Sequence, residues 1–257
     1  MRKVRIPGGN ARQGPSCAAR MESVSKVYGR GSGAVTALRE VSVTIPCGSF
    51  TAVMGPSGSG KSTFLHCAAG LDQATSGRVV LGDKDLSRMK ENELTRLRRE
   101  RVGFVFQAFN LIPSLTVTQN ITLPLRLAGA RADNAWLSEV IGRVGLADRL
   151  RHRPAQLSGG QQQRVAIARA LITRPDVIFA DEPTGALDMR TAREILGLLR
   201  RTAKEVHQTV VLVTHDPIAA SHADTVLFLA DGQIAGTTPA TSPDRIAERV
   251  TRLEACG

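Results

Sequence analysis

A glycine- and serine-rich segment, Gly55-Pro-Ser-Gly-Ser-Gly-Lys-Ser62, is the feature that most constrains the fold of this chain. It fits the pattern G-x-x-x-x-G-K-[ST], in which glycines let backbone N–H groups curl around phosphate oxygens. The apolar run 50–54 before it predicts a strand, and the small and apolar residues 62–69 after it predict a helix. The segment therefore predicts a strand–loop–helix unit that binds the phosphates of a nucleotide.

The residue types in this loop have distinct tasks. The helix that starts near Lys61 points its positive dipole end at the anion, and the Lys61 ammonium reaches the β- and γ-phosphates. The Ser62 hydroxyl is suited to bind Mg²⁺. The alternative is an accidental turn, but a chance match in such a chain is on the order of 1%. The predicted contacts to ATP are Gly55, Pro56, Ser57, Gly58, Ser59, Gly60, Lys61, Ser62 and Thr63.

A second apolar run, 177–180, ends in the carboxylates Asp181 and Glu182. The carboxyl ends of parallel strands meet at one edge of a sheet, where ligands bind. Asp181 is then placed to hold Mg²⁺, and Glu182 to act as general base on a water in line with the γ-phosphate. Taken alone, the pair is equally consistent with a surface turn before Pro183; the phosphate loop makes that alternative weaker.

Short apolar runs alternate with helical patterns along the chain, which predicts an α/β fold with a parallel sheet. Further strands are expected at 101–106, 210–214 and 226–230, with a hairpin turn at Asp231-Gly232. Residues 87–153 are more helical and charged, and we expect them to form an insertion in the sheet core. Thr191 and Glu194 have the spacing of a capping box, which predicts a helix start at residue 191.

The segment Leu157-Ser-Gly-Gly-Gln161 precedes a helical pattern and allows two interpretations. Ser158 and Gln161 have capping-box spacing, so the segment can be a plain helix start. Its glycines also allow a second anion-binding helix N-terminus. Spacing alone does not separate the two.

This LSGGQ segment, the QQRVAIARAL that follows it and the later ADEPTGALD together resemble ABC transporter ATPases, and the likeness runs from about residue 21 to 233. The resemblance implies a P-loop NTPase fold, with a RecA-like parallel-sheet core, an antiparallel β part and an inserted helical signature subdomain. It implies an ATPase domain at 21–240, with the helical subdomain at about 87–165. We expect residues 1–20 to be a basic, disordered tail, with Met21 as a possible true start, and residues 241–257 to be a C-terminal tail.

The resemblance also implies roles for single residues. Tyr28 matches the aromatic residue that stacks on adenine, and Gln107 matches the glutamine that contacts Mg²⁺ and the attacking water. His215 matches the histidine that contacts the γ-phosphate, so the implied catalytic residues are Glu182, His215 and Gln107. The implied metal contacts are Ser62, Gln107 and Asp181. Taken singly, each matched residue has an ordinary structural explanation, such as a half-buried strand aromatic for Tyr28.

ABC ATPases hold two ATP molecules between two subunits arranged head to tail, so the resemblance implies a second copy as a partner. The residues that would contact the ATP of the other copy are Ser158, Gly159, Gly160, Gln161 and Asp188. Transmembrane permease subunits are the other implied partner. The segment Gly185-Ala-Leu-Asp188, which matches the D-loop of the family, departs from many relatives, which have serine first.

Residues 104–116 and the TGALD segment are similar to the lipoprotein-release and macrolide-export group. In that group the residues that follow the glutamine matched by Gln107 form a groove for a permease helix. Either such a groove or the core of the helical subdomain accounts for the apolar side chains Phe109, Leu111, Ile112 and Leu115.

Composition narrows the partners further. Aromatic residues make up 4%, too few for a stacking surface for single strands, so no nucleic-acid partner is expected despite a net charge of +11. No apolar run reaches the 18 to 20 or so residues needed to span a bilayer. The cysteines form no C-x-x-C pair, so no zinc site is indicated. We expect a cytoplasmic protein, peripheral on the inner face of the membrane through a permease; the alternative is a non-transport ABC ATPase acting on DNA, ribosomes or the cell-division machinery.

Overall fold

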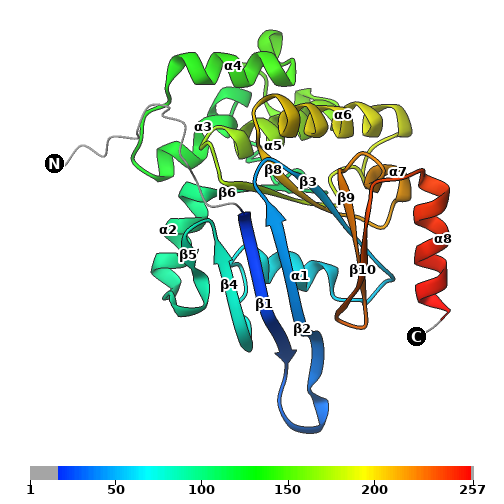
Figure 1. Cartoon of the computed structure of the whole chain (residues 1–257). Helices are drawn as coiled ribbons and strands as arrows, with labels where there is room; N and C mark the ends of the chain where they lie inside the picture. The colour runs from blue at the N-terminus through cyan, green and yellow to red at the C-terminus, as the bar shows by residue number, and fades with distance from the viewer. Residues whose placement is uncertain (1–16, 256–257) are drawn as a thin grey trace.

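The computed structural model describes residues 17–255, which fold around two β-sheets (Figure 1). The larger sheet has the strand order β10-β9-β3-β8-β7-β6. Its strands are β3 (Phe50–Met54), β6 (Val102–Phe106), β7 (Val177–Asp181), β8 (Thr209–Val213), β9 (Thr225–Ala230) and β10 (Gln233–Pro239). All neighbouring pairs are parallel except β9 and β10, which form the hairpin predicted at Asp231-Gly232.

Both faces of this sheet are buried, and this explains its continuous apolar runs. Alternate residues of each strand join two separate cores. In β8, Val210 and Leu212 pack into a core with helices on one face, whereas Val211 and Val213 pack into the core on the other face. The α/β fold and the parallel sheet predicted from the sequence are confirmed.

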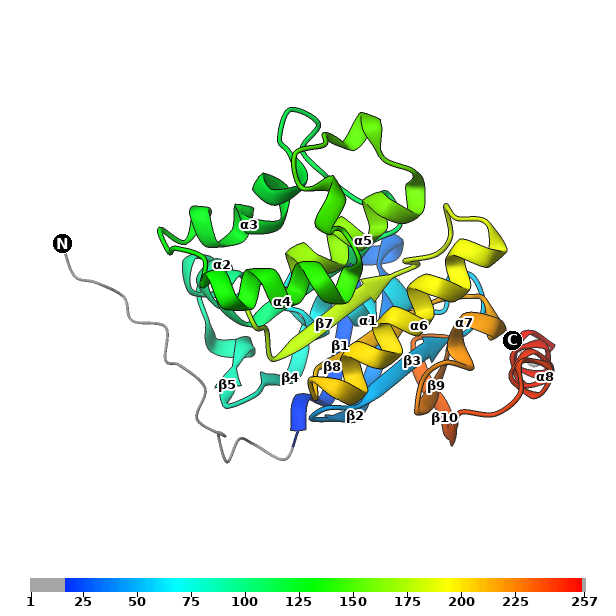
Figure 2. The ribbon, with the colours of Figure 1, turned by 90° about the horizontal axis from the view of Figure 1, so that it is seen from above.

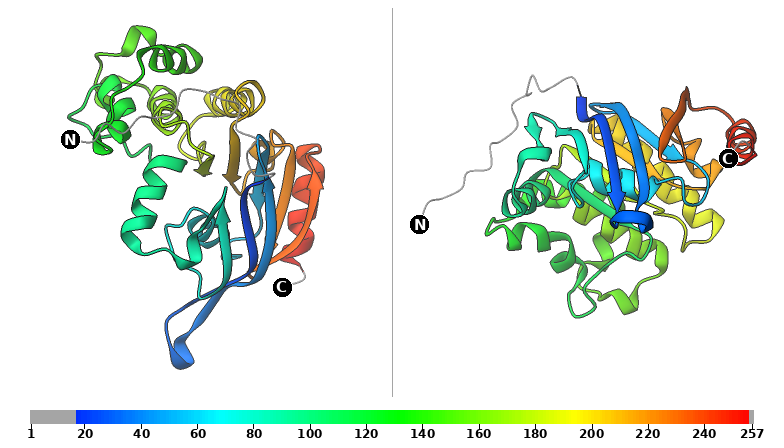
Figure 3. Two further views of the ribbon diagram at one scale, coloured as in Figure 1. Left: turned by 60° about the vertical axis from the view of Figure 1, so that its left-hand side comes forward. Right: turned by 90° about the horizontal axis from the view of Figure 1, so that it is seen from below.

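On one face lie the first helix, α1 (Lys61–Ala68), and a four-stranded antiparallel sheet of order β2-β1-β4-β5. Its strands are β1 (Cys17–Tyr28), β2 (Val35–Pro46), β4 (Ser76–Leu81) and β5 (Lys84–Asp85). The opposite face carries α5 (Gly159–Leu171) and α6 (Met189–Glu205), which run along β7, β8 and β3 (Figure 2). The short α7 (Pro217–Ala220) and α8 (Pro243–Glu254) cover the edge near β9 and β10 (Figure 3).

The middle of the chain is helical but is not a simple insertion. It holds α2 (Glu91–Arg101), α3 (Val117–Leu127) and α4 (Asn134–Val144), with β6 between α2 and α3. Because β6 pairs with β7 as the last strand of the parallel sheet, the expected span 87–165 includes one strand of the core. The helical layer itself begins after β6 and continues into α5, which packs on both α3 and α4.

Two expectations are corrected. Strand β1 begins at Cys17, and Ala18 and Ala19 are buried, so residues 17–20 belong to the fold rather than to a tail. Met21 lies buried inside this strand, paired on both sides; residues 1–16 of the expected tail lie outside the described residues. The helix expected to start at residue 191 starts at Met189, because the Asp188 side chain, not that of Thr191, caps it.

Candidate nucleotide-binding and catalytic site

Four neighbouring parallel strands deliver the predicted site residues to one edge of the sheet. In spatial order, β3 is followed by the phosphate loop, β8 by His215, β7 by Glu182 and β6 by Gln107. Phe106, Asp181 and Val213 stand in register at the ends of β6, β7 and β8. Sequence segments more than a hundred residues apart therefore meet at the carboxyl edge, where parallel sheets bind ligands.

The phosphate loop needs glycine where the chain passes other backbone closely. Gly55 has φ +156°, and a Cβ there would overlap the Leu229 carbonyl oxygen. Gly60 has φ +98° and is the N-cap residue of α1. Because glycine has no side chain, no capping side chain accepts hydrogen bonds from the first N–H groups of that helix. The loop therefore leaves an anion-binding helix terminus open.

The Lys61 ammonium lies against backbone carbonyl oxygens of the phosphate loop itself. It donates hydrogen bonds to the carbonyl oxygens of Gly55 at 2.9 Å and Pro56 at 2.6 Å. Partial burial lowers the pKa of Lys61, while the nearby carboxylates of Glu182 and Asp181 act in the opposite direction. The Lys61 ammonium therefore interacts both with the carbonyl oxygens of its own loop and with the charges of Asp181 and Glu182.

Glu182 is held by donors from the end of the neighbouring strand. The Thr214 hydroxyl donates to its Oε2 at 3.2 Å, and the His215 backbone N–H donates to its Oε1 at 3.0 Å. His215 Nδ1 lies 2.7 Å from the same Oε1, and an ionised carboxylate requires the proton on Nδ1. Glu182 itself has φ +46°, a backbone conformation that a non-glycine residue rarely adopts without a functional reason.

Asp181 ends β7 beside the phosphate loop. Burial and the charge of Glu182 raise the pKa of Asp181, whereas His66 and Lys61 act to lower it. A bound cation would relieve this unfavourable charge. Among residues 17–255 no three His, Cys, Asp or Glu side chains converge on a metal position. The Asp181 carboxylate and the Ser62 hydroxyl are oxygen donors of the kind that Mg²⁺ accepts together with substrate phosphates.

Gln107 follows β6 at this edge, whereas Tyr28 ends β1 in the antiparallel sheet. The exposed Gln107 side chain passes close to Gly185, in the loop after Glu182, where a Cβ would lie about 3 Å from its amide. Tyr28, the last residue of β1, is partly exposed, and its hydroxyl donates to Asp72 at 2.7 Å. The Lys26 ammonium lies 4.8 Å from the centre of the Tyr28 ring.

The five residues predicted to contact the ATP of a second copy lie at the starts of α5 and α6. Ser158 and Gln161 form a reciprocal capping box at the start of α5, with distances of 3.3 and 3.0 Å. Asp188 accepts from the Thr191 N–H at 3.0 Å, and a Cβ at Gly160 would collide with the Thr191 side chain. The two helix starts thus adjoin each other, and their hydrogen bonds are made locally rather than to the phosphate loop.

Sequence reasoning missed two polar residues of this edge. Thr214, which orients Glu182, reads as the last residue of an apolar strand. Gln163 reads as one of three solvent-facing glutamines at the start of a helix, yet it is fully buried and contacts both β6 and the loop after β7. Helical periodicity was the available signal, since Gln163 shares a face with the buried Gly160, Ile167 and Ala170.

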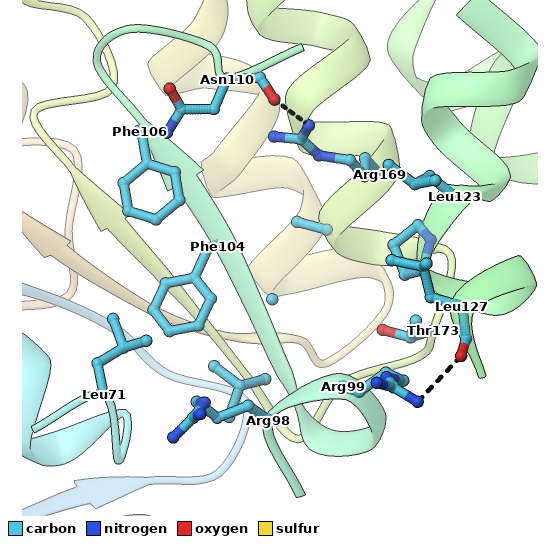
Figure 4. A pocket seen from close by; sticks show the side chains of 14 residues that line it. Leu71, Arg98, Arg99, Phe104, Phe106, Asn110, Leu123, Leu127, Arg169 and Thr173 are labelled. Carbon is cyan, nitrogen blue, oxygen red and sulfur yellow. Dashed lines mark hydrogen bonds between the residues drawn. The ribbon is translucent and has the colours of Figure 1, made fainter. Parts of the chain in front are cut away.

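A cavity of about 440 Å³ opens beside β6 and is bounded by α2, α3 and α5 (Figure 4). Phe104 and Phe106 of β6 form its apolar wall, with Leu127 of α3 at the rim, and Arg99 and Arg169 project toward it. Of residues 107–116, Asn110 lines this cavity; Phe109, Leu111, Ile112 and Leu115 do not. The stretch preceding Gln107, rather than the one following it, supplies the apolar surface of this cavity.

Comparisons with known proteins agree with this geometry. A protein-family profile described as ABC transporter matches residues 38–185. The macrolide export ATP-binding/permease protein MacB of Marinobacter nauticus is 44% identical over 87% of this chain, which spans 35% of that relative. An uncharacterised ABC transporter ATP-binding protein of Methanocaldococcus jannaschii, MJ0796, is 43% identical over 84% of this chain and 94% of its own length.

A solved structure of MJ0796 is described as a dimer in a post-hydrolysis state bound to ADP and Pi. It has a TM-score of 0.77 and 41% identity, and the match covers 87% of this chain and 99% of that one. The protein therefore belongs to the ABC transporter family, as an ATP-binding cassette of the ATP-hydrolysing P-loop class. Its relatives include the macrolide-export group that the sequence resembles.

Proposed function

We propose that the protein hydrolyses ATP with Mg²⁺ to drive a separate membrane permease, in a transporter of the export type. The observation that carries the proposal is the junction of the phosphate loop with the Glu182–His215 pair at one sheet edge. The export type rests on the macrolide-export relatives, of which this chain spans about a third. Through the permease, the protein lies at the inner face of the membrane.

In this site Lys61 and the N-terminus of α1 bind the β- and γ-phosphates, while the Tyr28 ring stacks on the adenine. Ser62, Asp181 and Gln107 would hold Mg²⁺, which when bound would neutralise charge that develops on the phosphates. Glu182 accepts a proton from the attacking water, and it is already oriented by Thr214 and by the His215 backbone. When His215 turns to the γ-phosphate, its ring releases Glu182 Oε1 for that water.

Two copies arranged head to tail complete each site. The start of α5 supports this part of the proposal, because the backbone N–H groups of a first helical turn have no partners within the helix. Ser158, Gly159, Gly160 and Gln161 of one copy then face the γ-phosphate in the other, with Asp188 beside them. Hydrolysis removes that shared ligand and lets the copies separate.

The permease is proposed to contact the cavity at β6. Its apolar wall and its cationic rim, which includes Arg99, suit an amphipathic helix with apolar and acidic side chains. Leu127 at the rim is 64% exposed and extends the apolar surface of the cavity. No helix within residues 17–255 has the length and hydropathy to cross a bilayer.

Glu182→Gln tests the assignment of the base. The variant keeps the shape and hydrogen-bond capacity of the side chain but cannot accept the water's proton. We expect binding of MgATP to persist, ATP-dependent dimers to accumulate in gel filtration, and phosphate release to fall by at least about 100-fold. Lys61→Ala is the matched control, because it should lose both turnover and the ATP-dependent dimer. Near-normal turnover by the glutamine variant would refute the role of Glu182.

A further inference from the structure

Gln163 joins the helix α5 to both catalytic loops. Its Nε2 donates to the Pro183 carbonyl at 2.6 Å and to the Phe106 carbonyl at 3.3 Å. Pro183 directly follows Glu182, and Phe106 directly precedes Gln107. A single side-chain amide therefore bridges the ends of β7 and β6, next to the proposed base and the proposed metal contact.

The orientation of this amide is determined by its surroundings. Gln163 is 0% exposed, and its Oε1 has no hydrogen-bond partner among the described residues. Turning the amide over would place Oε1 against two carbonyl oxygens and lose both hydrogen bonds. A buried, unpartnered acceptor is unfavourable, and such groups in native proteins call for a specific role.

The same helix begins at the residues proposed to contact the other copy's ATP. Ser158 caps α5, and Gln163 lies little more than one turn further along. Farther along α5, Arg169 donates to the carbonyl oxygens of Phe109 and Asn110, which both have positive φ. Arg169 thus holds the loop after Gln107, whereas Gln163 connects α5 to the end of β6 and to the loop after β7.

We propose that Gln163 is a positioning residue that makes the placement of Glu182 and Gln107 depend on the position of α5. The inference rests on the proposed function, since the partner's nucleotide acts on the start of α5. When the γ-phosphate bound to the other copy draws the α5 N-terminus inward, Gln163 moves the Pro183 and Phe106 carbonyls with it. Occupancy of one site then sets the alignment of the base in the other, which produces cooperative hydrolysis.

Gln163→Met tests this with a side chain of similar length that cannot donate. We expect kcat to fall roughly 10- to 100-fold, as for a misplaced catalytic group, and the Hill coefficient for ATP to fall toward unity. Binding of a fluorescent ATP analogue to the isolated monomer should be unchanged. Gln208→Met is the matched control: Gln208 is also buried and donates to two carbonyls, of Pro175 and Thr209, but at the opposite edge of the sheet. It should lower Tm yet leave kcat and the Hill coefficient as in the wild type.

Gln163→Glu gives a second readout that does not depend on the methionine variant folding. An ionised carboxylate faces the two carbonyls unfavourably, whereas a protonated one donates to one of them. The ratio of its kcat to that of the wild type should therefore rise as pH falls, with no such rise for Gln208→Glu.

If both Gln163 variants lose only stability, as the Gln208 variants do, the positioning role is wrong while the assignment of Glu182 stands. If the wild type itself shows no cooperativity and no ATP-dependent dimer, the proposed dimeric function fails, and the inference fails with it.

Discussion

The two edges of the parallel sheet are built from the same strands but differ in how their polar groups are satisfied. At the amino edge, the Phe50 N–H donates to Asp224 at 2.9 Å, the Gly48 N–H donates to Thr209 at 3.0 Å, and Gln208 donates to Pro175. At the carboxyl edge, Ser59 Oγ and Gln163 Oε1 are buried with no partner among the described residues.

The pKa values of charged groups follow the same division, whereas the backbone conformation does not. At the carboxyl edge, burial lowers the pKa of Lys61 and raises that of Asp181. Positive φ angles occur at both edges, at Glu182 after β7 and at Arg174 and His207 before β7 and β8. Charged groups with shifted pKa values gather where ligands bind, because interactions with the ligand compensate for the cost of burying them. The comparison indicates that the amino edge stabilises the fold, whereas the carboxyl edge gives up stability for function.

The largest expected effect comes from Gly55→Ala at the carboxyl edge. The added Cβ would overlap the Leu229 carbonyl, so the loop must move and the fold loses more than about 3 kcal/mol. Urea denaturation measures the free energy of unfolding, and a binding assay measures the affinity for ATP. We expect both quantities to be severely reduced. Gly58→Ala is the control, because Gly58 also has positive φ but no atoms within 4 Å of a Cβ, and it should cost only about 1–2 kcal/mol. Equal effects of the two substitutions would contradict the close approach at Gly55.

Asp181→Asn should separate stability from activity. The pKa of Asp181 is raised in the folded state, so the folded protein holds this proton to higher pH than the unfolded chain does. The contribution of this proton to stability is present below the ordinary aspartate pKa of 3.8 and is lost as pH rises through the folded pKa. At pH 7 the ionised carboxylate therefore destabilises the nucleotide-free protein.

We expect Asp181→Asn to raise Tm at pH 7, with the gain shrinking as the pH approaches 4, while MgATP turnover falls to background. Thermal scans across this pH range and a phosphate-release assay check both parts. A lower Tm at pH 7 would show that Asp181 belongs with the stabilising groups.

A smaller effect is expected at the amino edge, from Asp224→Ala. It leaves the N–H of the buried Phe50 without its partner, which should cost about 1–3 kcal/mol, with kcat per folded molecule unchanged. Glu248→Ala, which breaks an exposed ion pair with Arg252, should cost no more than about 0.5 kcal/mol. A change in kcat for Asp224→Ala would contradict the assignment of the amino edge to stability rather than to catalysis.

Much of the candidate site could be predicted from the sequence because local residues carry its chemistry. The phosphate loop needs glycines at set spacings, and carboxylates at the end of an apolar strand lie at the ligand edge of any parallel sheet. The strands beside these motifs were recognisable for the same reason, since strands buried on both faces are continuous apolar runs. Local pattern failed at Thr191, where a plausible capping box was outcompeted by Asp188 one turn earlier.

The sequence by itself determined the local motifs of nucleotide binding and the residues proposed to perform the chemistry, from Gly55 to Ser62 and at Asp181 and Glu182. Only the tertiary structure decided that His215 holds Glu182 and that Gln163 ties α5 to both catalytic loops. The physical reason is that strand order places β8 between β3 and β7, a result of long-range packing. A polar run such as Gln161-Gln-Gln163 likewise does not reveal which amide will be buried until the helix is packed against the sheet.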